Sequence, residues 1–236
     1  RSGATAGTIS ELVTVAAPGV TLEHLALVHA EPAGNVLQAL VPCRVRQVIL
    51  AGRSTRPEFH AGVEMDTVFC ATEYPLIARN GPSAIRNSIV LHGLDLSGTA
   101  AMEIDNVLVA GAGAEVRCPG QFSKCIVMGP VTLYSEGASM SDSIICGDLK
   151  ATQAGCKIQH CDISGKCVDF AKPGPSCFSA DPQFADRKNL DYRLLPTSPC
   201  LRKAADGGDL GVRWTPEMAA LIRQAVLLRQ EGMLQF

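Results

Sequence analysis

The strongest constraint on this chain is an internal repeat of about 20 residues. Eight short segments each open with an apolar residue, at successive spacings of 23, 20, 20, 19, 18, 18 and 18 residues. The opening residues are Leu22, Val45, Met65, Ile85, Ile104, Phe122, Met140 and Ile158. A repeat of this length is one supersecondary unit that buries its apolar side only against its neighbours, so the pattern predicts a solenoid.

Every segment has the same order of side-chain types. The residue five places after the opening one is apolar in all eight: Leu27, Leu50, Cys70, Val90, Val109, Val127, Ile145 and Ile163. The residue two places after it is polar: His24, Gln47, Thr67, Asn87, Asn106, Lys124, Asp142 and His160. The residue three places after it is small or apolar. Side chains alternate along a straight strand, so the opening residue and the residue three places after it would face opposite sides. Both can face the core only if the chain bends at the polar residue between them.

Glycine-containing turns follow the strands and separate the units, and glycine supplies the positive φ that tight corners need. Each unit is therefore expected to be strand, bend, strand, turn, strand and turn. Eight such coils stacked about 4.8 Å apart would form a rod about 35–40 Å long. The units contain no apolar stripe of helical period, which excludes helical solenoids.

Two of the segments, 85–90 and 104–109, resemble the coils of right-handed parallel β-helix proteins, the pectate-lyase-like superfamily. An asparagine ladder often fills the bend in that family, and Asn87 and Asn106 would form a partial one. The stretches 181–184, 191–194, 198–199 and 208–211 are similar to the family's C-terminal exit sequence. The resemblance covers about residues 15–212 and implies an all-β fold, a right-handed parallel β-helix of about eight short coils.

We expect residues 1–212 to form the β-helix, with an exit segment at about 177–212, and residues 213–236 to form a capping α-helix. Thr215 is the expected N-cap, Pro216 the first helical residue, and Gly232 the stop. The expected apolar face is Met218, Leu221, Ile222, Ala225, Leu227 and Leu228. This helix is expected to cover the end of the last coil. The sequence shows no cap at the N-terminus, so we expect residues lost upstream, a neighbouring domain or a second subunit to supply one.

A left-handed β-helix built from hexapeptides, typical of acyltransferases, is the rival architecture. Coils of 18 residues have the right length for it. Apolar residues also recur every six positions: Ile104, Ala110, Val116, Phe122, Met128, Tyr134 and Met140. The series fails at Thr152 and Ser164, and the early coils are too long, so the right-handed form is preferred.

Charge and composition exclude some classes of partner. The chain has 21 basic and 23 acidic residues, a balance that gives no footprint for nucleic acid. No apolar run approaches 18 residues, so no membrane span is expected. The ten cysteines favour a reducing compartment, whereas the family resemblance implies a secreted protein. Cys177 and Cys200 could pair in an oxidising one. No cofactor or metal site is expected, because the spacing of Cys156, Cys161 and Cys167 is unlike a zinc motif.

Enzymes of the resembled superfamily cleave acidic polysaccharides with clustered acidic and basic residues. The outward row Glu23, Arg46, Asp66, Arg86 and Asp105 alternates in sign, which indicates ion pairs on a solvated face. Short coils leave little length for loops that could wall a groove, and the longest loops are those between the first coils. A ligand groove, if present, is expected beside these loops. Its candidate residues are Arg53, Arg56, Glu58, His60, Glu73, Tyr74 and Arg79.

These features favour a noncatalytic β-helix module for binding or scaffolding, within a larger or oligomeric protein. Its expected partners are carbohydrate, or a protein at the N-terminal end. The first alternative is a carbohydrate-active enzyme, a lyase or glycoside hydrolase acting on an acidic glycan, which rests on analogy of fold alone. The second is a hexapeptide-type acyltransferase.

Overall fold

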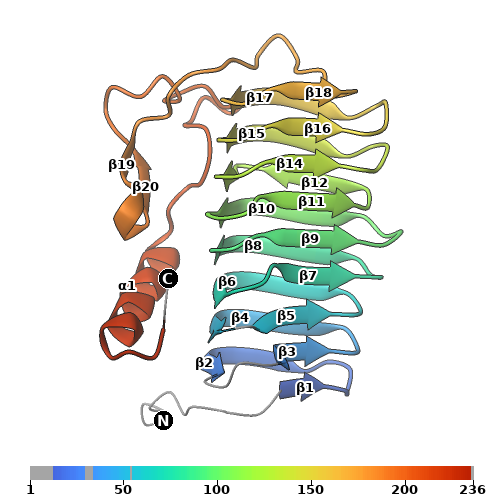
Figure 1. Cartoon of the computed structure of the whole chain (residues 1–236), viewed down its shortest axis with the longest axis vertical. Helices are drawn as coiled ribbons and strands as arrows, with labels where there is room; N and C mark the ends of the chain where they lie inside the picture. The colour runs from blue at the N-terminus through green and yellow to red at the C-terminus, as the bar shows by residue number, and fades with distance from the viewer. Residues whose placement is uncertain (1–12, 30–33, 54, 235–236) are drawn as a thin grey trace.

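The computed structural model describes residues 13–29, 34–53 and 55–234, and shows a parallel β-helix (Figure 1). Two parallel sheets run its length. The front sheet contains β1 (Val13–Val15), β3 (Gly34–Ala39), β5 (Thr55–Phe59), β7 (Leu76–Arg79), β9 (Leu94–Ser97), β11 (Ala114–Arg117), β14 (Val131–Leu133), β16 (Leu149–Ala151) and β18 (Cys167–Asp169). The rear sheet contains β2 (Thr21–His29), β4 (Cys43–Gly52), β6 (Val63–Thr72), β8 (Ser83–Val90), β10 (Met102–Val109), β12 (Gly120–Ser123), β13 (Ile126–Val127), β15 (Ser139–Ile145) and β17 (Lys157–Ile163).

The chain winds as a right-handed helix. In Figure 1 the front strands run to the right, the rear strands run to the left, and each coil lies above the one before it. The eight repeated segments occupy eight successive rungs of the rear sheet. The apolar residues five places after each opening residue, from Leu27 to Ile163, are direct register partners in successive strands and form one continuous column inside the core. The predicted solenoid is confirmed.

The polar position is the predicted bend. All eight residues there, from His24 to His160, have a positive φ between 49° and 58°. Asparagine tolerates this left-handed region better than most residues. Two rungs form the expected partial ladder: Asn106 Nδ2 donates to Asn87 Oδ1, and Asn87 Nδ2 donates to Asp66 Oδ1, each at 2.8 Å.

Beyond the bend, the rear sheet is apolar on its outer side as well. Phe69, Ile89, Leu108, Ile126 and Ile144 are buried there, outside the helical core. The C-terminal tail covers them. It contains the hairpin β19 (Phe184–Asp186) and β20 (Asp191–Leu194), joined through the short 3-10 helix η1 (Arg187–Asn189), and then the helix α1 (Pro216–Gln230).

The start of α1 follows the prediction. The Thr215 side chain accepts a hydrogen bond from the Met218 backbone at 3.2 Å, and Pro216 is the first helical residue. The helix ends at Gln230, two residues before Gly232. Leu227 was predicted to be buried but is 57% exposed, because its side of the helix faces away from the sheet.

The position expected for α1 was wrong. The helix does not cover the end of the last coil; it packs against the side of β4, β6 and β8 (Figure 1). The apolar outer side of the rear sheet accounts for this position, since it offers a long surface that must be covered. The last coil is covered instead by the chain that follows β18, which forms bridges to β17. No helix among the described residues has the length and apolar character needed to cross a bilayer.

The hexapeptide architecture is wrong. Ile104, Val116 and Phe122 lie in the helical core, but Met128 lies on the outer side with the tail and Tyr134 is exposed. The six-residue series is therefore not a core column.

The first rungs are less completely buried than the middle ones. Val13, Val20, Leu22 and Leu25 pack against the core but remain partly exposed. The predicted absence of an N-terminal cap concerns residues 1–12, which lie outside the described residues.

Candidate functional site

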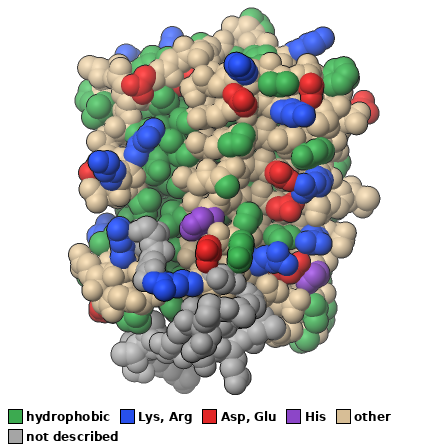
Figure 2. All heavy atoms as spheres, viewed as in Figure 1, with side chains coloured by type: hydrophobic (Ala, Val, Ile, Leu, Met, Phe, Trp, Pro, Cys, Tyr) green, Lys and Arg blue, Asp and Glu red, His purple; other side chains and the backbone are tan. Residues whose placement is uncertain are grey.

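The outer face of the front sheet carries the polar side chains that the sequence analysis singled out. Register pairing stacks one outward column along this face: Gln38, Glu58, Ile77, Asp95, Glu115, Thr132, Lys150 and Val168. From Gln38 to Lys150, the residues on either side of each member are buried, because side chains alternate along a strand. Figure 2 shows basic, acidic and histidine side chains gathered on this face.

Glu58 is the centre of a charged cluster on this face. Its side chain is only 8% exposed. Its carboxylate lies 3.4 Å from Arg79 Nη2, 3.7 Å from Arg56 Nη2 and 3.8 Å from His60 Nε2. Asn35 Nδ2 donates to the same carboxylate at 3.3 Å. A buried carboxylate is costly without partners, so these groups explain how the fold tolerates Glu58.

The cluster retains unused hydrogen-bonding capacity. The cation–carboxylate distances exceed the roughly 2.7–2.9 Å of a charge-assisted hydrogen bond. Arg79 Nε is buried without a hydrogen-bond partner in the structure. The cationic side chains around Glu58 are partly open to solvent, with exposures of 44% for Arg56, 41% for Arg79 and 34% for His60. Because unsatisfied buried polar atoms are rare, they mark this cluster as a candidate site.

Four of the seven predicted residues therefore meet: Arg56, Glu58, His60 and Arg79. The expectation that they line loops was wrong for Arg56, Glu58 and Arg79, which lie on strands of the front sheet. Tyr74 lies next to the cluster, where its backbone nitrogen donates to Thr55 at 3.2 Å and its side chain is exposed.

Arg53 and Glu73 lie apart from the Glu58 carboxylate, exposed in the turns that connect the rear sheet to the front sheet. Two residues of the cluster were not predicted: Asn35, which donates to Glu58, and Gln38, whose Nε2 lies 3.1 Å from His60 Nε2. Both residues are on β3, one rung below Glu58. The signal that could have found them is their outward position in a strand that pairs with β5.

A second charged group lies further up the same face. Arg117 Nη1 donates to Asp95 at 2.7 Å, Arg117 also pairs with Glu115, and its guanidinium lies 5.0 Å from the centre of the Tyr134 ring. The ring is partly exposed. This arrangement provides a cation–π pair on a flat face, beyond the first group along the helix axis.

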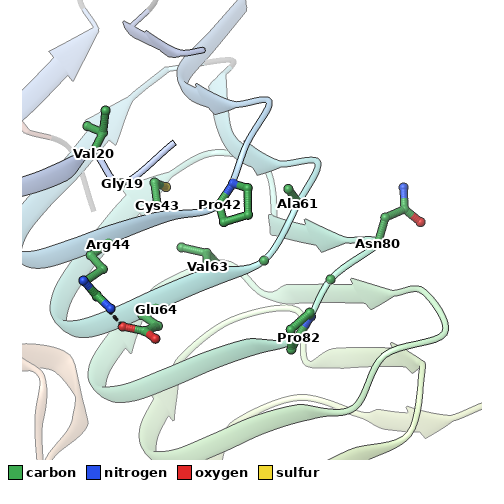
Figure 3. Close-up of a pocket in the computed structure, with 12 residues that line it drawn as sticks. Gly19, Val20, Pro42, Cys43, Arg44, Ala61, Val63, Glu64, Asn80 and Pro82 are labelled. Atoms are coloured by element: carbon green, nitrogen blue, oxygen red, sulfur yellow. Dashed lines mark hydrogen bonds and ion pairs between the residues drawn. The ribbon is translucent and has the colours of Figure 1, made fainter. Parts of the chain in front are cut away.

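A hollow of about 380 Å³ lies between successive turns that lead into the rear sheet (Figure 3). Its lining is mainly glycine, proline and apolar side chains, with the Arg44–Glu64 ion pair at one side, where Arg44 Nε donates to Glu64 at 2.6 Å. Burial raises the pKa of the Cys43 thiol in its wall to about 11, so this thiol is protonated near neutral pH. The hollow therefore offers space but little chemistry.

The outward row of the rear sheet forms the expected ion pairs in part. Arg46 lies 3.5 Å from Glu23 and 3.9 Å from Asp66, as expected. Arg86 instead lies 2.5 Å from Glu103, which is outside the predicted row. These pairs are well exposed, so each contributes under about 1 kcal/mol. The described residues contain no group of three or more His, Cys, Asp or Glu side chains placed to hold a metal ion.

The structure does not bring Cys177 and Cys200 together. Cys177 packs against the helical core, whereas Cys200 lies on the outer side of β17, where its thiol donates to Asp162 Oδ2 at 3.3 Å. The strand lies between the two groups, so the pairing suggested by their positions in the tail is wrong.

Comparison with known protein families, with curated proteins and with solved structures gave no match to this chain.

Proposed function

We propose that this chain is a noncatalytic β-helix module that binds carbohydrate on the outer face of its front sheet, at the Glu58 cluster. The observation that carries the proposal is the set of half-exposed donors around a nearly buried carboxylate. Arg56, His60 and Arg79 each contact Glu58 loosely, and Arg79 Nε has no hydrogen-bond partner in the structure. Donors held in this way on a rigid sheet are preorganised for a polar ligand.

Sugar hydroxyls both donate and accept hydrogen bonds, so a carbohydrate site needs both kinds of group. The two arginines supply fixed donors, and the amides of Asn35 and Gln38 supply donors and acceptors. Tyr74 adds an exposed aromatic surface beside them. A flat face without long loops suits an extended chain that lies along the helix axis, where it would next meet Arg117 and Tyr134.

The position of Glu58 supports binding in preference to catalysis. A catalytic carboxylate must reach the substrate to exchange a proton. Glu58 is buried beneath its cationic partners, and Asp95, the next carboxylate in its column, accepts a hydrogen bond from Arg117.

One observation favours the enzyme alternative. Glu58 and Asp95 are two rungs apart in one column, which is about 9.6 Å by strand spacing. Inverting glycoside hydrolases place their two carboxyl groups about 6.5–9.5 Å apart. The backbone spacing is just above that range, so a glycoside hydrolase would use these two residues as its acid and base only with their side chains inclined toward each other.

Titration calorimetry tests the proposal with an oligogalacturonate as the acidic probe and a cello-oligosaccharide as the neutral one. Arg79→Ala is expected to weaken binding roughly 10- to 150-fold, because hydrogen bonds from charged groups contribute about 1.5–3 kcal/mol. Arg44→Ala is the matched control, since it removes an arginine from an ion pair on the rear sheet. Equal affinity in the two variants, or no binding of either probe, would contradict the proposal.

The same probes distinguish a module from an enzyme. Assays for new reducing ends and for unsaturated products are expected to show no turnover. Turnover that is lost in both Glu58→Gln and Asp95→Asn would reject the noncatalytic assignment.

We also propose that the module belongs to a larger or oligomeric protein that adds to its N-terminal end. The partly exposed core positions Val13, Val20, Leu22 and Leu25 support this. Light scattering of the purified chain tests self-association: Leu22→Lys is expected to lower a mass above that of a monomer. A monomer unchanged by the substitution would exclude assembly through a second copy.

A further inference from the structure

The last coil brings two cysteines side by side. After β18 the chain turns back and pairs with β17, with bridges between Asp162 and Phe178 and between Ile158 and Pro173. The Phe178 nitrogen donates to the Cys161 carbonyl at 3.0 Å, and the Ile163 nitrogen donates to the Phe178 carbonyl at 2.9 Å. Each cysteine directly precedes a member of the Asp162–Phe178 bridge, so Cys161 and Cys177 are neighbours across one strand spacing.

Both sulfur atoms lie on the inner side of this coil. Cys161 is fully buried in the helical core, and Cys177 is partly buried against the same core. The Cys161 sulfur lies 3.2 Å from the Gln159 carbonyl oxygen, and the Cys177 sulfur lies 3.5 Å from the Ile158 carbonyl oxygen. One strand spacing, about 4.8 Å, falls within the roughly 4.4–6.8 Å between Cα atoms that a disulfide requires.

We propose that Cys161 and Cys177 form a redox modification site that closes to a disulfide by exchange with a low-molecular-weight disulfide such as oxidised glutathione. The Cys177 thiolate attacks one sulfur of the small disulfide, forms a mixed disulfide and releases one small thiol. The Cys161 sulfur then attacks Cys177 and releases the second small thiol. The two cysteines lose two protons and two electrons, and the small disulfide is reduced to two thiols.

The environment of Cys177 makes it the attacking group. A hydrogen bond from the Cys161 thiol, together with backbone donors and His160, lowers the pKa of Cys177 to about 6 in spite of its partial burial. The hydrogen bond to Cys177 and burial raise the pKa of the Cys161 thiol. By contrast, burial raises the pKa of Cys70 to about 11. The lowered pKa favours the thiolate, which is the reactive form. Cys177 is also the more exposed of the two cysteines, so a small disulfide reaches it first.

Closure would tie the exit segment to the last coil. The chain from Cys177 leads into the hairpin and the helix α1, which cover the rear sheet. The disulfide is therefore expected to hold the start of the tail in place and to raise the melting temperature by several degrees, because it restricts the unfolded chain.

Mass spectrometry of the full chain after incubation with oxidised glutathione at pH 7 tests the proposal. A tryptic peptide that carries Cys161 is expected to be joined to the one that carries Cys177. Trypsin does not cut between Lys172 and Pro173, so Cys167 shares the second peptide. The Cys167→Ser variant removes this ambiguity and is expected to form the same cross-link.

Single variants test the order of the steps. Cys161→Ser is expected to stop at the mixed disulfide, with one glutathione retained on Cys177. Cys177→Ser is expected to leave Cys161 unmodified in the folded protein. A cross-link that disappears in Cys167→Ser, or folded wild-type protein in which Cys177 does not react, would overturn the proposal.

Discussion

Asn106 joins the bend of one coil to the start of the C-terminal helix, and its substitution tests how the tail is attached. Asn106 Oδ1 accepts from the Arg213 nitrogen at 2.5 Å. Asn106 Nδ2 donates to the Arg213 carbonyl and to Asn87 Oδ1, each at 2.8 Å. The residue also has a φ of 58°, in the left-handed region.

The expected cost of Asn106→Ala follows from these contacts. Three hydrogen bonds at about 1 kcal/mol each give about 3 kcal/mol. Placing alanine in the left-handed region of φ and ψ adds about 1 kcal/mol to the loss in the free energy of unfolding. Asn106→Gly loses the same hydrogen bonds but not the conformational term, so it is expected to cost about 1 kcal/mol less than the alanine variant.

Urea unfolding followed by circular dichroism measures the free energy of unfolding. Fluorescence of Trp214, the one tryptophan in the chain, reports the attachment of the tail separately, since it follows Arg213 directly. In both variants the tryptophan transition is expected to precede that of the coils. A loss below 1 kcal/mol in Asn106→Ala, with the two transitions still coincident, would refute this account of the attachment.

Two further predictions concern single side chains. Burial raises the pKa of Asp162 above its ordinary value of 3.8, and the folded value therefore exceeds the unfolded one. The stability that Asp162 contributes is present below its unfolded pKa and is lost as the pH rises through its folded pKa. Asp162→Asn is therefore expected to gain stability relative to wild type from about pH 4 upward. Stability–pH curves of the two proteins that run parallel would contradict this. Thr67 has a φ of 57° at its bend, where a β-branched residue is strained. Thr67→Asn is therefore expected to raise the free energy of unfolding, measured in urea, by about 1 kcal/mol. A variant less stable than wild type would count against this.

The coils could be predicted from the sequence because the inward and bend positions each have one chemical character throughout. Val90, Val109 and Val127 have the same place in their segments, and only stacking buries all three. The bend was predictable for a similar reason, since the first and fourth residues of each segment can both face the core only if the chain bends between them.

The position of α1 could not be predicted in this way. The rear sheet is apolar on its outer side at Phe69, Ile89 and Leu108, which shows that something must cover it, but an apolar surface does not specify its cover. The exposed solenoid end and the side of the sheet were both open to the helix. The lateral site is the longer apolar surface, and the helix occupies it.

The Glu58 cluster was predictable only in part, because its members come from three coils of unequal length. Asn35, Glu58 and Arg79 lie in β3, β5 and β7, and they meet because strand pairing aligns them on one face. The early coils are longer than the later ones, so the repeat alone does not fix that alignment. A shift of one residue in β5 would turn Glu58 into the core and Phe59 to solvent. Burial of Phe59 therefore fixes Glu58 on the outer face, and the packing of the coil positions the proposed binding site.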